Sequence, residues 1–327
     1  MTDAVPIKWL TPEYLRDLHV NPHQHPRGQA HLSAASGLVQ AGARLFVVAD
    51  DELHLGVLDA IDPKQPSPRN PSPVALIRLF EGDLPKDKLK RKKAKPDLET
   101  LAVLPSLPGC PYGALLALGS GSQPARQTGV MVALDVHGDP TERIAHIDLT
   151  NIYAPLRKRF PDLNIEGAFV SSGELRLLQR GNKGDSRNAC IGYDWNQVSP
   201  WLAGRTQTPP APKAVNDIAL GEVDGVPLGL TDGAPFADGA WAFSAVAENT
   251  VNSFLDGACA ASAVGVVNAD GSLRALWRLE GAPKVEGIAV TVPVGTTTDG
   301  ILVNLVTDSD DPAIASQLLR VWLPAGV

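Results

Sequence analysis

The stretch Pro96-Asp97-Leu98-Glu99-Thr100-Leu101 places one glutamate inside a short apolar segment that follows a loop. Weaker copies occur as Asn164-Ile165-Glu166-Gly167-Ala168 and Lys284-Val285-Glu286-Gly287-Ile288. A second apolar segment follows each copy, so each copy is typical of the first strand of a hairpin. An acid in such a strand needs a polar space for its side chain. We therefore predict strands that line a central channel and aim their carboxylates at its axis.

Segments of this kind recur five times, because 33–38 opens the series and 229–233 supplies its fourth member. The steps between reference residues are 63 (36 to 99), 67 (99 to 166), 66 (166 to 232) and 54 (232 to 286). Such a regular period predicts a repeat architecture.

Each first strand is followed by further strand-like segments. The second strands are near-continuous apolar runs, typical of strands covered on both faces: 45–51, 114–120, 175–181, 241–248 and 301–308. The third strands are 55–59, 129–135, 190–194, 262–267 and 318–322. More polar fourth strands, suited to an outer edge, are 75–79, 143–147, 217–221 and 273–278.

The fifth unit lacks a fourth strand, and the N-terminal segment Ile7-Lys8-Trp9-Leu10 is available to complete it. The pattern predicts an all-β protein, a five-bladed β-propeller whose N-terminal strand closes the last blade. A six-bladed ring is the alternative if a long unit contains an extra blade. We expect a single domain over 1–327, with 11–32 and 83–95 as loop or insertion segments, and a short helical turn at 152–161.

The composition indicates which classes of partner and which cellular compartment to expect. A formal charge of −7 and a pI near 5.5 argue against nucleic-acid binding, which requires a basic face. No secretory signal or apolar run long enough to cross a bilayer is visible, so no membrane partner is expected. Three widely spaced cysteines fit reduced thiols. We therefore expect a cytoplasmic protein.

Two segments have an unusual composition, one rich in histidine and one rich in basic residues. His19, His23, His25 and His31 lie in a non-periodic segment without zinc-binding spacing, which favours a flexible loop. The basic run 86–95 is interpreted as a solvated crossover, with a patch for phosphate or nucleic acid as the alternative.

The acids of the first strands are the candidate metal ligands: Glu99, Glu166, Asp232 and Glu286. Carboxylates at close range raise one another's pKa or require a cation. Calcium is the natural candidate, since it binds six to eight oxygen ligands. Two alternatives remain open. Lys95, Arg180 and Lys284 neutralise the acids, or the acids bond backbone amides and water.

The predicted ligand contacts extend this set to neighbouring strand ends. Asp308 begins an oxygen-rich turn, and Arg180 begins a basic turn suited to an anionic small molecule. The full set is Glu99, Glu166, Arg180, Asp232, Glu248, Glu286 and Asp308. Neither a nucleophile elbow nor a phosphate-binding loop is present in the sequence.

Four stretches, 95–99, 243–248, 284–288 and 306–312, resemble a family of uncharacterised bacterial β-propeller proteins, over roughly residues 33–322. More distantly, the inner strands are similar to those of phytase-like and esterase-like propellers and of calcium-dependent lactonases. That remote resemblance implies a calcium ion at the channel mouth and hydrolysis of phosphoesters or lactones.

Two hypotheses follow. In the first, the propeller binds a small ligand or divalent cation at its acidic axis without turnover. In the second, it is a calcium-dependent hydrolase of phosphoesterase or lactonase type that uses the same acids, with a metal-bound water or neighbouring acid as nucleophile or base.

Overall fold

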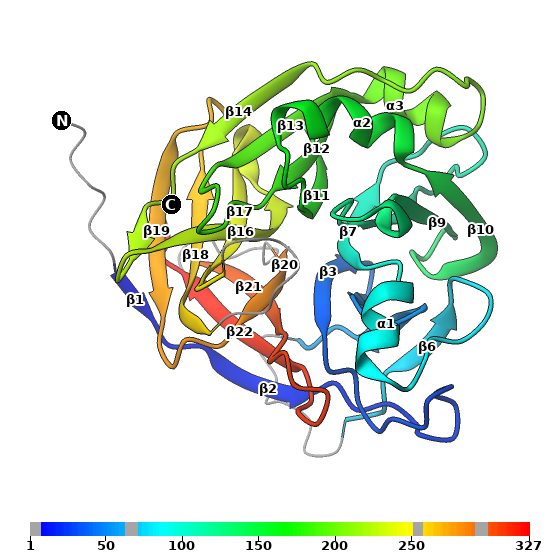
Figure 1. Cartoon of the computed structure of the whole chain (residues 1–327), viewed down its shortest axis with the longest axis horizontal. Coiled ribbons are helices and arrows are strands. Elements are labelled where there is room, and N and C mark those ends of the chain that lie inside the picture. The colour runs from blue at the N-terminus through cyan, green and yellow to red at the C-terminus, as the bar shows by residue number, and fades with distance from the viewer. Residues whose placement is uncertain (1–7, 63–70, 251–257, 292–299) are drawn as a thin grey trace.

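Five β-sheets surround a common axis in the computed structural model, which describes residues 8–62, 71–250, 258–291 and 300–327 (Figure 1). The innermost strands are β3 (Ala35–Ala41), β7 (Leu98–Leu104), β11 (Ile165–Ser171), β16 (Val226–Pro235) and β20 (Val285–Thr291). Each contacts the next around the ring, and β20 contacts β3. The chain is a five-bladed β-propeller, as predicted, and the six-bladed alternative is wrong.

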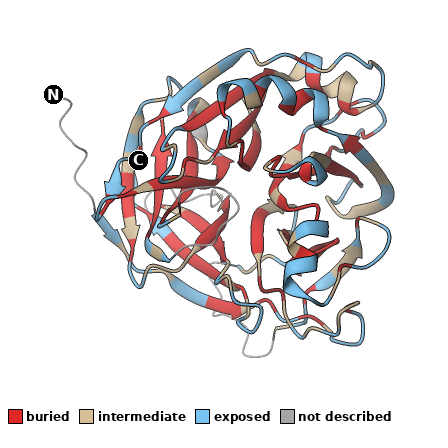
Figure 2. Cartoon of the chain, viewed as in Figure 1, coloured by how far each residue is buried: buried red, intermediate tan, exposed pale blue. Residues whose placement is uncertain are grey.

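Three further strands complete each blade toward the outside. The second strands are β4 (Arg44–Ala49), β8 (Ala114–Gly119), β12 (Glu174–Gln179), β17 (Trp241–Glu248) and β21 (Ile301–Thr307). The third strands are β5 (His54–Asp59), β9 (Thr128–Leu134), β13 (Asn188–Asp194), β18 (Cys259–Val267) and β22 (Gln317–Leu323). The outer strands are β6 (Ala75–Arg78), β10 (Pro140–Asp148), β14 (Ala214–Ile218), β19 (Leu273–Leu279) and β2 (Glu13–Asp17). Every residue of β8 and β17 is buried, as their apolar sequences predict (Figure 2).

An N-terminal strand closes the ring, but it is not the one that hydrophobicity indicated. Strand β2 pairs antiparallel with β22 in the last blade. Strand β1 (Lys8–Leu10), in the segment expected there, pairs parallel with β19 of the fourth blade instead. The polar strand fits because only Leu15 and Arg16 need burial at this edge, while Glu13 and Tyr14 face solvent. Residue 7 lies outside the described residues.

Two other boundaries differ from the sequence prediction. The outer strand of the third blade is β14, which overlaps the predicted 217–221 at only its last two residues. The next residues form β15 (Glu222–Val223), a hairpin partner of β16. Segment 11–32 is not all loop, because β2 lies within it.

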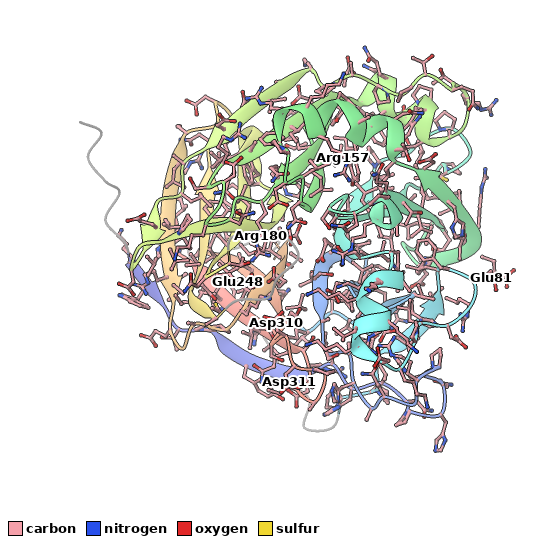
Figure 3. All side chains as sticks on the ribbon, viewed as in Figure 1. Glu81, Arg157, Arg180, Glu248, Asp310 and Asp311 are labelled. Carbon is pink, nitrogen blue, oxygen red and sulfur yellow. The ribbon has the colours of Figure 1, made fainter. Side chains whose placement is uncertain are left out.

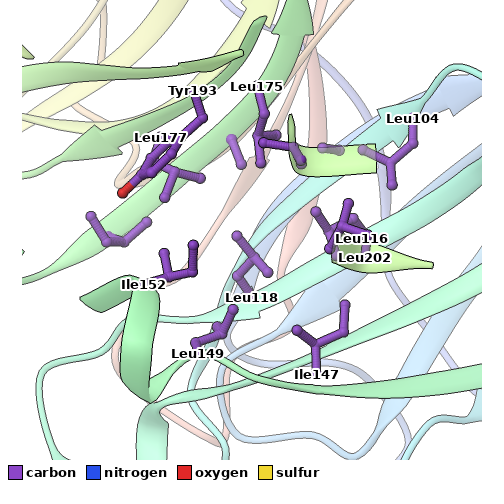
Figure 4. Packing of buried hydrophobic residues seen from close by; sticks show 14 of the residues in the cluster. Leu104, Leu116, Leu118, Ile147, Leu149, Ile152, Leu175, Leu177, Tyr193 and Leu202 are labelled. Atoms are coloured by element: carbon purple, nitrogen blue, oxygen red, sulfur yellow. The ribbon is translucent and has the colours of Figure 1, made fainter. Parts of the chain in front are cut away.

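Helices cover the seams between blades. Helix α1 (Lys88–Ala94) lies in the 83–95 insertion and begins at Asp87, whose side chain accepts a hydrogen bond from the Lys90 amide. The predicted turn at 152–161 is α2 (Thr150–Arg159), whereas α3 (Trp195–Leu202) was not predicted. Both pack on a large apolar cluster between the second and third blades (Figure 4). Two 3₁₀ turns, η1 (Pro124–Arg126) and η2 (Ala237–Gly239), complete the elements. No described helix is both long and apolar enough to cross a membrane.

Glycines let the inner strands approach one another near the axis. A Cβ at Gly37 would lie 2.7 Å from the Leu101 amide nitrogen, and one at Gly287 would lie 2.9 Å from that of Leu38. Because real Cβ contacts of that length are essentially absent, glycine is needed where the strands converge. The Gly that follows the acid in two of the repeats therefore has a packing reason.

Candidate functional site: the axial cavity

A bulge in each inner strand determines which side chain is turned out of the ladder. The register shifts fall at Ser36, Glu99, Glu166, Thr231 and Glu286, between flanking residues that still pair with the second strand. Four of these are the reference residues of the sequence repeat. In the fourth blade the equivalent residue is Thr231, one position before the predicted Asp232.

Asp232 consequently has a different location from the other acids. It is fully buried and does not line the axial cavity described below. Its carboxylate accepts hydrogen bonds from the amides of Gly233 (2.7 Å) and Ile288 (3.0 Å), and also from that of Leu38. Its assignment beside the three glutamates is thus wrong in position, and the carboxylate joins three inner strands. Burial raises the pKa of Asp232 well above its usual range, against the effect of these amides.

Thr231 and Ser36, the two non-acidic bulge residues, also bond neighbouring blades. The Thr231 hydroxyl donates to the Val285 carbonyl at 2.9 Å. The Ser36 hydroxyl donates to the Leu98 carbonyl at 2.6 Å. The remaining three bulge residues are the glutamates, and all three line one cavity.

This axial cavity lies at one end of the channel and has a volume of about 80 Å³, room for several waters or one hydrated ion. Its charged lining comprises eight acidic and five basic side chains: Asp50, Asp97, Glu99, Glu166, Glu248, Glu286, Asp308 and Asp310, with Lys92, Lys95, Arg126, Arg180 and Lys284. Figure 3 shows Arg180, Glu248 and Asp310 toward the centre of the ring, and Glu81 at its periphery. All the predicted ligand contacts except Asp232 therefore meet in one place.

Glu99 stands in a group of three carboxylates with Asp50 and Asp97. One oxygen from each lies within 4.8 Å of the other two. Asp97 reaches this position because its backbone is left-handed (φ 59°), a conformation that aspartate tolerates better than most residues. Among the described residues, Glu99 has neither an ion-pair partner nor a hydrogen bond. The carboxylates of Asp50 and Asp97 both form ion pairs with Lys95. Asp97 forms a second ion pair with Arg126, at 2.7 Å.

Arg180 is the cation of the opposite half of the cavity. Its guanidinium lies 2.5 Å from Glu248, 3.4 Å from Glu166 and 3.6 Å from Glu286. Asn164 adds a hydrogen bond to Glu166. The basic turn that begins at Arg180 therefore binds the protein's own carboxylates through its first residue.

Lys284 connects this half to the loop after β21. Its ammonium lies 3.4 Å from Glu286 and 2.7 Å from Asp310. Asp308 accepts the Asp310 amide at 2.7 Å. The buried Oε2 of Glu286 receives no hydrogen bond from any described residue.

The pKa values of three acids in the cavity are raised, with burial as the largest cause. Burial, reinforced by Glu166, raises the pKa of Glu99 well above its usual range. Burial raises the pKa of Glu166 to about 8, although Arg180 opposes the shift. Burial also raises the pKa of Asp308 well above its usual range. All three shifts favour the protonated carboxyl groups.

Several residues that line the axial cavity were not among the predicted ligand contacts, although sequence patterns indicated some of them. Asp50 and Asp310 belong to oxygen-rich turns after second strands, and Asp97 stands beside Glu99 in the most regular repeat. Asn164 stands two residues before Glu166, as Asp97 does before Glu99, and Asn182 belongs to the basic turn that begins at Arg180. Arg126 and Thr250 carry no such signal, because only the meeting of blades brings them to the axis.

The basic run and the histidine segment are both anchored. Arg91 of α1 is buried against Asp51 at 3.0 Å, and Lys92 and Lys95 line the cavity, so the run is not simply a solvated crossover. The ring of His25 is buried and hydrogen-bonds Glu52 at 2.9 Å. The interpretation of 19–31 as a flexible loop is thus wrong at this residue.

Residues 31–323 match the model of a family described as "Family of unknown function (DUF6929)". The chain belongs to this family. No curated protein matches the sequence.

Similar solved structures span nearly the whole propeller at low identity. Glutaminyl cyclase from Myxococcus xanthus is 11% identical with a TM-score of 0.47, over 97% of this chain and 99% of its own. Regucalcin, a calcium-binding protein from Agrobacterium tumefaciens, is 10% identical with a TM-score of 0.45, over 99% and 100%. Arabinanase Arb43A from Bacillus subtilis is 11% identical with a TM-score of 0.41, over 90% and 94%. These likenesses are too remote to assign a ligand.

Proposed function

We propose that the protein binds a divalent cation, calcium in the first place, in the axial cavity. The observation that carries the proposal is the carboxylate of Glu99, which faces two further carboxylates within 4.8 Å and forms no hydrogen bond or ion pair with a described residue. Two unit charges 4 Å apart interact by about 4 kcal/mol at an effective dielectric constant of 20. A cation at this position therefore offsets the repulsion among the three carboxylates.

The donor chemistry favours a hard cation. The charged lining offers carboxylate oxygens, and no histidine or cysteine is among the described lining residues. This is the donor set of calcium or magnesium rather than of zinc. The acids come from different blades and loops, and calcium tolerates such irregular geometry better than magnesium does. The ligands of the proposed site are Asp50, Asp97 and Glu99, and the carboxyl groups of Glu166 and Glu286 line the same cavity.

Replacing Glu99 with glutamine is expected to weaken calcium binding about 30-fold or more, because one of three charged ligands becomes a neutral amide. Isothermal titration calorimetry on chelator-treated protein measures the effect. Glu81→Gln is the matched control, since Glu81 is exposed at the periphery (Figure 3) and its change should leave the affinity unaltered. Failure of the wild-type protein to bind calcium or magnesium at millimolar concentrations would refute the proposal.

Glu166→Gln should increase stability at high pH and leave it nearly unchanged at low pH. The folded protein holds the Glu166 proton up to about pH 8, whereas the unfolded chain releases it near 4.5. The free energy of unfolding due to this group therefore falls as the pH rises from about 4.5 to 8. We expect the variant to gain a few kcal/mol over wild type at pH 8.5 in metal-free urea unfolding. If the variant and wild type were equally stable at pH 8.5 as well as at pH 4, Glu166 would not be protonated in the folded protein.

A second candidate is calcium-dependent hydrolysis of an ester or lactone. Glu166 favours it, because a carboxyl group with a pKa of about 8 is protonated at neutral pH and can donate to a leaving oxygen. The test is hydrolysis of simple lactones and phosphate or carboxylate esters with and without calcium. If wild type and Glu166→Gln both bind calcium but hydrolyse none of these compounds, hydrolysis is excluded and cation binding is the function.

A further inference from the structure

Lys95 occupies an unusual place in the axial cavity. It follows α1 directly and precedes the left-handed Asp97. Its ammonium bonds to Asp50 and lies 2.8 Å from Asp97, and the side chain is only 9% exposed. Two of the three carboxylates of the proposed cation site are thus already bonded to an internal cation.

The positions of this ammonium and of a bound calcium ion overlap. A calcium ion lies about 2.3–2.6 Å from its oxygen ligands, close to the distance at which an ammonium bonds a carboxylate. A cation bound by all three carboxylates would have to share this space with the ammonium. Since both are positive and the site is poorly solvated, they cannot both remain there.

We propose that Lys95 is a displaceable internal counter-cation, which a divalent cation must replace and which thereby sets the affinity and charge selectivity of the site. This inference rests on the proposed function. A monovalent ion would replace the ammonium of Lys95 by an equal charge, while the two ion pairs of Lys95 would be lost. A divalent ion adds a charge in that exchange, and this favours divalent over monovalent cations.

A neighbouring groove offers acceptors for the displaced ammonium group of Lys95. Lys95 also lines a groove of about 70 Å³ beside the cavity, together with Ser33, Asp51 and Asp311. The buried Oδ1 of Asp51 receives no hydrogen bond from the described part of the chain. Asp308 and Asp310 line both spaces, so the groove offers acceptors within the same network.

Lys95→Met tests the inference through affinity and selectivity. The apparent dissociation constant equals the intrinsic one divided by the fraction of molecules that have the site free, so a Lys95 that is displaced about 1% of the time weakens binding about 100-fold. We expect the variant to bind calcium about 100-fold more tightly and to bind sodium or potassium measurably. Lys93→Met removes the same charge from an exposed position of α1 and should leave the affinity as in wild type.

Lysine labelling gives a readout that does not depend on the variant's folding. Reductive methylation followed by mass spectrometry should leave Lys95 largely unmodified without calcium and modify it when calcium is bound, with Lys93 modified equally in both. Lys95→Arg, which keeps a bound cation, should bind calcium no more tightly than wild type.

The outcomes separate the inference from the function. If wild type binds calcium but Lys95→Met binds no more tightly, or Lys95 stays protected in the bound state, the inference is wrong and the proposed function stands. If wild type binds neither calcium nor magnesium, the proposed function fails, and the inference with it.

Discussion

Asp232→Ala is expected to destabilise the propeller by about 3–6 kcal/mol, because it leaves backbone amides of three inner strands without an acceptor. The carboxylate accepts from Gly233 and Ile288, and the amide of Leu38 also bonds it. Water cannot replace it readily, since Asp232 is fully buried. Urea unfolding of wild type and variant, monitored by tryptophan fluorescence, measures the loss.

Asp232→Asn is the matched control. Asparagine keeps one acceptor oxygen and nearly the same volume, so we expect it to lose well under half as much stability as alanine. Neither change should alter the affinity for calcium by more than a few-fold in folded protein, because Asp232 does not line the cavity. A loss of binding in Asp232→Asn at full stability would contradict the structural role.

Deletion of residues 1–17 is expected to open the ring and cost about 5 kcal/mol or more. It removes the outer strand of the last blade and with it Leu15, which is 4% exposed in the apolar core. It also leaves Arg320, bonded to both carboxylate oxygens of Glu13 at 2.9 and 3.0 Å, without its partner. Glu13 is half exposed, but the Arg320 side chain is buried, so the deletion leaves a buried guanidinium without its ion-pair partner.

A shorter deletion, of residues 1–11, separates the two N-terminal strands. It removes β1, which only extends the edge of the fourth blade, and keeps β2 in place. We expect a decrease in melting temperature of a few degrees, against a loss of cooperative unfolding near the wild-type temperature for the longer deletion. Equal effects of both deletions would show that β2 does not close the ring.

Local sequence patterns are enough to predict the number of blades and most of the strands. Apolar runs such as β8 and β17 are buried on both faces, so their composition alone identifies them. The recurring acid at Glu99, Glu166 and Glu286 also identified the residue that faces the axial cavity in three of the five inner strands. These features are local, because a strand's side-chain pattern records which of its faces is buried.

The tertiary structure decided what depends on distant parts of the chain. All five inner strands have a bulge at the equivalent place, but in the fourth repeat the acid comes one residue after it. Because neighbouring residues of a strand point in opposite directions, Asp232 is an internal bridge and Thr231 takes the equivalent position. Closure by β2 rather than β1 depended on pairing with a strand some 300 residues away. Lys95 could be noted beside an acid in the sequence, but its bond to Asp50 appears only when the first and second blades meet. The charge balance of the axial site is therefore a property of the closed ring, because its acids and cations come from all parts of the chain.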